Sequence, residues 1–71
     1  MITGEQVRAA RKLLGWSQED LAGHAGMSDY TVGTFERGLR PSENTVTVLQ
    51  RALESAGVEF PEGEPVRLRK P

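Results

Sequence analysis

The sequence predicts a small all-α fold of four helices with a short β-hairpin at its C-terminus. Four segments each begin at a Ser or Thr suited to cap a helix, end near a glycine and carry apolar residues at helical spacing. After Gly57 the apolar residues instead alternate with polar ones, which is the period of a β-strand. At 71 residues the chain is one domain. We divide it into a helical part, 1–57, and a hairpin or tail, 58–71.

The first two helices are expected at 3–14 and 17–25, ending at Gly15 and Gly26. Thr3 and Gln6 have the spacing of a capping box, and Ser17 with Asp20 comes close to one. The residues expected to face inward are Val7, Ala10, Leu13 and Leu14 from the first helix and Leu21, Ala22 and Ala25 from the second.

The other two helices are expected at 28–37, capped by Ser28, and at 42–56, opened by Pro41 and Ser42. Gly38 and Gly57 follow their ends. The inward residues are Val32 and Phe35, then Val46, Leu49, Ala52 or Leu53, and Ala56. One core is expected from Leu14, Leu21, Val32, Phe35, Leu49 and Leu53, with Trp16 buried or half-buried between two helices.

The tail alternates apolar and polar residues at 58–60 and at 66–68, around a turn-forming segment at 61–65. A hairpin alone is marginal, so Phe60, Val66 and Leu68 need a surface to cover. That surface is either the helices of the same chain or a second copy. The alternative interpretation is a tail without fixed structure.

Composition excludes several classes of protein. The sequence has no cysteine for a disulfide or thiolate zinc site, and no apolar run long enough to span a membrane. Its N-terminus lacks a signal-peptide pattern, so we expect a cytoplasmic location and no membrane partner. His24 is the only histidine and is expected on the surface, and no nucleophile motif is present. We therefore expect no catalytic residues, no metal and no cofactor.

The charge balance does not itself favour nucleic acid. Nine basic and ten acidic residues give a net charge of −1 and a pI near 5.8, whereas nucleic-acid-binding domains are often strongly basic. Any affinity for DNA must therefore come from the local placement of charges.

The segment 16–38 combines two short helices with a tight glycine-containing turn. This is the pattern of a helix-turn-helix, whose second helix can enter the DNA major groove. Five short runs of residues resemble the Cro/C1-type (XRE) helix-turn-helix family of bacterial and phage regulators. They lie at 9–11, 14–22, 25–28, 31–32 and 36–38. The resemblance covers about residues 3–56 and implies a lambda-repressor-like helix bundle.

The resemblance also implies roles for individual residues. Gln18 matches a position that contacts a DNA phosphate, and Arg11 matches an arginine that pairs with the acid found here as Glu36. Arg37 and Arg40 lie where the family often touches phosphate. The positions that face bases or backbone from the recognition helix are Ser28, Asp29, Tyr30 and Thr34.

Three features depart from the family pattern. Asp29 either accepts a hydrogen bond from cytosine or, the interpretation we favour, only stabilises the start of its helix. Gly33 either admits a close approach of DNA or is a neutral surface residue. The hairpin at 58–68 takes the place of the family's fifth helix. A homodimer is still expected, built at least partly from this tail.

The expected function is sequence-specific binding of double-stranded DNA by a transcriptional regulator, repressor-like and not an enzyme. The alternative is a protein-interaction module, such as an antitoxin-type partner that keeps the fold without DNA affinity. The acidic pI, Asp29 and the absence of lysine from the recognition helix favour this alternative.

Overall fold

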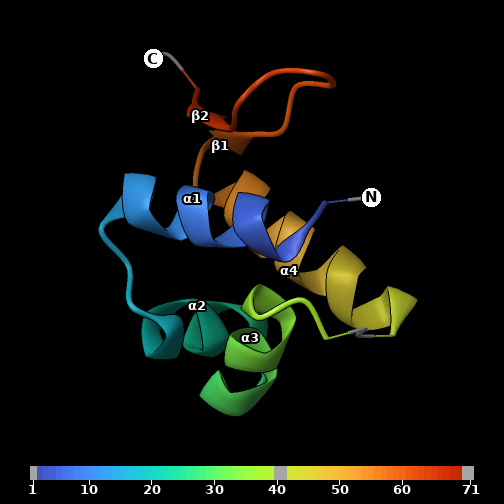
Figure 1. Cartoon of the computed structure of the whole chain (residues 1–71). Helices are drawn as coiled ribbons and strands as arrows, with labels where there is room; N and C mark the ends of the chain where they lie inside the picture. Colours follow the sequence, from blue (N-terminus) through green and yellow to red (C-terminus); the bar gives the residue numbers. More distant parts are fainter. Residues whose placement is uncertain (1, 40–41, 70–71) are drawn as a thin grey trace.

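The computed structural model, which describes residues 2–39 and 42–69, contains four α-helices and a two-stranded antiparallel hairpin (Figure 1). The elements are α1 Gly4–Leu14, α2 Gln18–Ala25, α3 Asp29–Glu36, α4 Glu43–Ser55, β1 Val58–Glu59 and β2 Arg67–Leu68. The predicted all-α fold with a short C-terminal hairpin is confirmed. Within the described residues, no helix has both the length and the apolar character needed to cross a membrane.

Each helix begins at its predicted cap. Thr3 and Gln6 form a complete capping box, and so do Ser17 and Asp20, where Ser17 Oγ accepts from the Asp20 amide at 3.0 Å. Ser28 and Ser42 accept from the amide of the third residue after them. Because a cap lies outside its helix, each helix begins one residue later than the predicted range.

The helix ends also follow the glycines. Gly15 and Gly26 cap α1 and α2 in the left-handed conformation, with φ of 71° and 69°. Gly38 and Gly57 also have positive φ, and each follows the last residue of α3 or α4 by two positions. Other residue types are strained in this conformation, which explains why glycine marks the ends so reliably. Pro41, predicted to open the fourth helix, lies outside the described residues.

One hydrophobic core joins the four helices. Five of the six predicted core residues are buried in it: Leu21, Val32, Phe35, Leu49 and Leu53. Leu14 is half-buried against the same cluster, as is Trp16. The prediction for Leu13 is wrong, because its side chain is 44% exposed. Val7, Ala10 and Leu14 already fill the inner face of α1, so Leu13 lies at the edge of that face.

The hairpin packs on the helices of its own chain. Val58 is fully buried and pairs with Leu68, while Phe60 and Val66 pack against the core. Of the three tail residues expected to need a surface to cover, Leu68 is the one that stays exposed, at 44%. β1 contacts α4 and β2 contacts α1. The hairpin therefore lies on the opposite side of α1 and α4 from α2 and α3, as Figure 1 shows.

Candidate nucleic-acid interface

α2 and α3 form a tightly joined pair. Gly26 ends α2 and the Met27 amide donates to the carbonyl of Ala22 at 3.0 Å, so the chain reverses within three residues before Ser28 caps α3. The pair buries Leu21 and Ala22 from α2 against Val32 and Phe35 from α3. Burial of this face leaves the opposite face of α3 toward solvent.

The exposed face of α3 carries the residues expected to meet DNA bases. Tyr30 is 74% exposed, and Ser28 and Asp29 are also exposed, whereas Thr34 is half-buried one turn after Tyr30. Ser28 Oγ caps the Thr31 amide, and Thr34 Oγ1 donates to the Thr31 carbonyl at 3.0 Å. Within the described residues, the side chains of Asp29 and Tyr30 have no hydrogen-bond partner. Asp29 and Tyr30 therefore offer the polar groups most available to a ligand.

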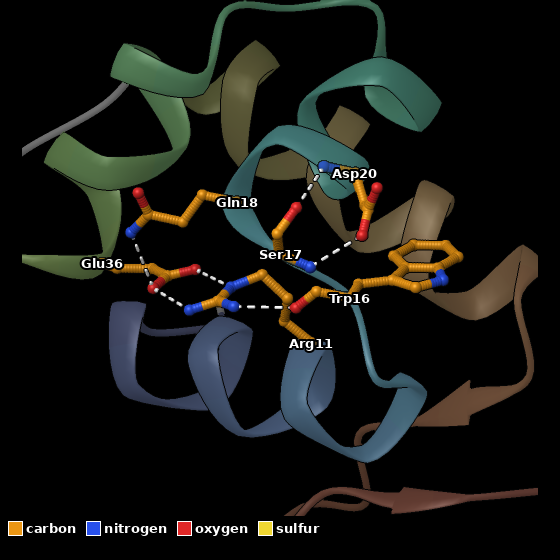
Figure 2. A network of polar contacts seen from close by, with 6 residues as sticks. All are labelled: Arg11, Trp16, Ser17, Gln18, Asp20 and Glu36. Atoms are coloured by element: carbon orange, nitrogen blue, oxygen red, sulfur yellow. Dashed lines mark hydrogen bonds and ion pairs between the residues drawn. The ribbon is translucent and has the colours of Figure 1, made fainter.

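A part-buried ion pair joins α1 to the end of α3 (Figure 2). The Arg11 guanidinium donates to Glu36 through Nε at 2.8 Å and Nη2 at 3.0 Å, and through Nη1 to the carbonyl of Trp16 at 2.8 Å. The two side chains are 12% and 5% exposed. Two parallel hydrogen bonds between a guanidinium and a carboxylate fix both orientation and distance. The pair thus fixes α1, the start of α2 and the end of α3 relative to one another.

The pKa values of both partners reflect this contact. Burial raises the pKa of the Glu36 carboxyl, but hydrogen bonds from Arg11 and Gln18 and the charges of Arg11 and Arg8 outweigh burial. The pKa of Glu36 therefore lies below its ordinary value. The hydrogen bond to Glu36 raises the pKa of Arg11 in turn. Both groups are charged at neutral pH.

Gln18 belongs to the same network. Its Nε2 donates to Glu36 Oε1 at 3.2 Å, so its amide lies against the end of α3 (Figure 2). On the other side, Gln18 Oε1 lies over the backbone of Gly33. Gly33 is buried, which rules out its interpretation as a neutral surface residue. Because position 33 has no side chain, Gln18 can cross α3 at this point.

Basic side chains surround a hollow beside this network. The hollow has a volume of about 550 Å³, and its lining includes Arg8, Arg11, Lys12, Gln18, Glu36 and Arg37. Arg11 neutralises Glu36, while Arg8, Lys12 and Arg37 form no ion pair with the described residues. Gln18, the first residue of α2, also lines the hollow, so the N-terminus of this helix lies beside it. The site is therefore locally basic although the chain is acidic overall.

The structure thus brings together some of the predicted site residues. Gln18 and Arg37, expected at phosphates, share the basic hollow with Arg11 and Glu36. Arg40, the third expected phosphate ligand, lies outside the described residues. Sequence reasoning missed Arg8 and Lys12. Their spacing of one helical turn was a usable signal, but the nearly balanced charge count of the whole chain concealed it.

Two further sets of side-chain contacts lie outside the basic hollow. The rings of Trp16 and His24 stack with centroids 4.1 Å apart and an interplanar angle of 3°, a contact the sequence did not reveal. His24 is exposed, as predicted. In the tail, Arg67 donates to Glu59 at 2.9 Å, and Arg69 donates to the carbonyl of Glu54. Among the described residues, no three His, Asp or Glu side chains are grouped to hold a metal ion.

Comparison with known proteins agrees with this architecture. A search among curated proteins gives no match. A family profile described as a helix-turn-helix domain matches residues 3–62, which include all four helices and β1. The match spans most of the chain, and the paired α2 and α3 supply the structural feature for which the family is described. The chain therefore belongs to the helix-turn-helix domain family.

Proposed function

We propose that this protein binds double-stranded DNA sequence-specifically and regulates transcription as a homodimer of the Cro/C1 type. The observation that carries the proposal is the arrangement of two surfaces on α2 and α3. The exposed face of α3 presents groups without internal partners, and the basic hollow lies at its C-terminal end. Base reading and phosphate binding require such neighbouring surfaces. Regulation of bacterial or phage genes would place the protein in the cytoplasm.

Base reading is assigned to α3. Tyr30 extends from the helix and can reach base edges with its hydroxyl. Thr34 already uses its hydroxyl hydrogen in the bond to Thr31, so its methyl group is suited to contact a thymine methyl. Ser28 and Asp29 lie at the leading end of the helix, where they face bases or backbone. In this role α3 enters the major groove while α2 lies across the backbone.

Phosphate binding is assigned to the basic hollow and its neighbours. Arg37 and Gln18 are joined there by Arg8 from α1, with Arg40 expected just beyond α3. The Gln18 amide is held by Glu36 and stands beside the first amides of α2, which favour anions. Only a few basic side chains contact phosphates in this arrangement, so the salt dependence of DNA binding should be shallower than that of a strongly basic repressor.

A second function is favoured by a different observation. Tyr30 is 74% and Leu39 58% exposed, one near each end of α3. Exposed aromatic and aliphatic side chains are more typical of a protein interface than of a phosphate-binding surface. Together with Asp29, they fit an antitoxin-type module that binds a protein through α3. In that case the basic hollow has no DNA to bind.

Selection from random DNA duplexes distinguishes the two functions. The full chain at low salt should enrich a family of related sequences, and the two-fold symmetry of a dimer should give them dyad symmetry. Affinity for the selected duplex should fall with added salt, and it should exceed affinity for a scrambled duplex by about a thousandfold or more. Recovery of no common sequence, with equal weak retention of all duplexes, rejects sequence-specific binding.

A further inference from the structure

A second hollow lies on the other side of α1, beside the hairpin. It has a volume of about 670 Å³ and is bounded by the outer face of α1 and the end of the hairpin loop. Its apolar side chains are Ala9, Leu13, Pro65 and Val66. Leu13 was predicted from the sequence to be buried, but its side chain is 44% exposed in the structure. An exposed apolar groove bordered by charges is typical of an interface with another protein.

The outer face of α1 is complementary to itself. Glu5 stands in the first turn, Ala9 one turn later, and Lys12 with Leu13 in the last turn. The same face therefore carries an acid at one end, a base at the other and a small residue between them. When two such helices cross antiparallel at Ala9, Glu5 of each comes opposite Lys12 of the other, because residues 5 and 12 lie at similar distances from residue 9. This pattern of charges specifies a second copy as the occupant.

We propose that the groove between α1 and the hairpin is the homodimer interface, with α1 packed antiparallel against α1 of a second copy about a two-fold axis near Ala9. An isologous contact of this kind is the commonest one in soluble oligomers. This contact between the two copies of α1 buries Leu13. Pro65 and Val66 of the hairpin then line one edge of the interface. Val58 and Phe60 stay in their own chain, because they already pack into its core.

The size of the face suits a reversible dimer. A standard interface buries about 800 Å² on each partner. That is about one sixth of the 4778 Å² surface of this chain. Because charges border the groove and its apolar floor is small, the dimer should dissociate in the micromolar range rather than be obligate.

The same axis is compatible with DNA binding, and this step depends on the proposed function. α2 and α3 lie on the opposite side of α1 from the hairpin (Figure 1). Consider a two-fold axis that runs from the hairpin side of the molecule toward the α3 side. Rotation about this axis makes α1 of the second copy antiparallel to α1 of the first. Both copies of α3 then lie on the same side of the dimer. Two recognition helices on one side of a dimer can occupy two half-sites of a symmetric operator.

Charge reversal tests the interface without DNA. Sedimentation equilibrium of the full chain should show a monomer–dimer equilibrium. Glu5→Lys and Lys12→Glu should each raise the dimer dissociation constant about tenfold, since each puts like charges opposite one another twice. The double variant E5K/K12E restores opposite charges and should return the constant to within about threefold of the original. Arg51→Glu, an exposed charge reversal on α4 away from the groove, is the matched control and should leave the constant unchanged.

A second variant tests the apolar part of the interface. Leu13→Asn should raise the dissociation constant without lowering the unfolding temperature at low protein concentration, because the residue is exposed in the monomer. A wild-type chain that stays monomeric up to about 1 mM overturns the proposal, and so does a double variant as weak as the single ones. Binding of the selected duplex is measured separately. A monomer that binds DNA rejects only the interface, and a dimer that binds no duplex rejects only the function.

Discussion

The side-chain amide of Gln18 crosses α3 directly above Gly33, and its Oε1 lies 3.3 Å from the position that a Cβ of residue 33 would take. A glycine inside a helix costs about 1 kcal/mol relative to alanine. Here that cost allows the Gln18 amide to reach Glu36, to which it donates at 3.2 Å. Gly33 thus lowers the stability of α3 but lets Gln18, a proposed phosphate ligand, keep its orientation.

This coupling can be measured by a double-mutant cycle. In a Gln18→Ala background, Gly33→Ala should raise the free energy of unfolding by about 1 kcal/mol, the full difference in helix propensity. In the wild-type background the gain should be smaller, because the new methyl group displaces the Gln18 amide from Glu36. Urea denaturation of the four proteins gives both values. Equal gains in the two backgrounds would mean that Gln18 and Gly33 act independently.

The ion pair between Arg11 and Glu36 should dominate the polar contribution to stability. Arg11→Met leaves the Glu36 carboxylate without its principal partner at 5% exposure, which should cost about 3 kcal/mol. Replacing both residues with methionine removes the stranded charge, so the double variant should recover at least about 1 kcal/mol of that loss. Thermal denaturation followed by circular dichroism measures both effects. A double variant less stable than Arg11→Met would contradict the argument.

The lowered pKa of Glu36 predicts the pH range in which this contribution disappears. A group whose pKa is lower in the folded state stabilises the fold fully above its ordinary pKa of 4.5, and the contribution is lost as pH falls through the folded value. The difference in unfolding free energy between wild type and Glu36→Gln should therefore shrink as the pH is lowered below about 4.5. A difference that stays constant down to pH values of about 2 would show that Glu36 does not titrate with folding.

Two glycines should respond oppositely to the same substitution. A Cβ at Gly4 would lie 2.9 Å from the Cα of Glu36 and still closer to the carbonyl oxygen of Phe35, so the backbones of α1 and α3 would have to separate. Gly4→Ala should therefore destabilise the fold by about 1–3 kcal/mol. Gly23 lies in the middle of α2 with open space around it, and Gly23→Ala should stabilise the fold by up to about 1 kcal/mol. The same sign of change at both positions would refute this interpretation.

The helices followed from short-range patterns in the sequence. Ser17, Ser28 and Ser42 cap helices through contacts within three residues, and a glycine is needed where the backbone turns left-handed. Such signals need no knowledge of tertiary structure. Leu13 was misjudged because it lies at the edge of the inner face of α1, where the packing of neighbouring elements decides burial.

The site needed contacts between distant parts of the chain. Gly4 and Gly33 have functions only because α1 and Gln18 approach α3 there, and a single sequence does not reveal such approaches. The basic hollow was likewise missed, because Arg8 and Arg37 line one hollow only through the packing of α1 against α3. The pairing of Arg11 with Glu36 was inferred from a family resemblance, not from spacing.

Arg8 should contribute to DNA binding through phosphate alone. Arg8→Gln should weaken binding to every duplex by a similar factor and lower the slope of log affinity against log salt by about one unit. Arg51→Gln, an exposed change on α4 outside the basic hollow, is the matched control and should leave the slope unchanged. Fluorescence anisotropy over a series of salt concentrations measures the slope. An unchanged slope for Arg8→Gln, with the protein folded, would remove Arg8 from the phosphate-binding set.

Asp29 should oppose DNA binding even though it lies at the leading end of the recognition helix. Its exposed carboxylate has no hydrogen-bond partner in the described residues, and near a phosphate backbone it raises the electrostatic energy of the complex. Asp29→Asn keeps the shape of the side chain and should tighten binding to all duplexes by about three- to tenfold. It should also cost about 0.3 kcal/mol of stability, because a negative charge favours a helix N-terminus.

If Asp29 instead reads a base, a different result is expected for the same variant. A carboxylate that accepts from cytosine N4 would make Asp29→Asn lose preference at one base pair, by about 1–3 kcal/mol, without tightening binding elsewhere. Repeating the duplex selection with Asp29→Asn separates the two results. Tyr30→Ala serves as the comparison, because loss of a base-reading side chain should relax one position of the selected sequence and leave the others intact. If Asp29→Asn relaxes a single position in the same way, Asp29 reads a base and the repulsion argument is wrong.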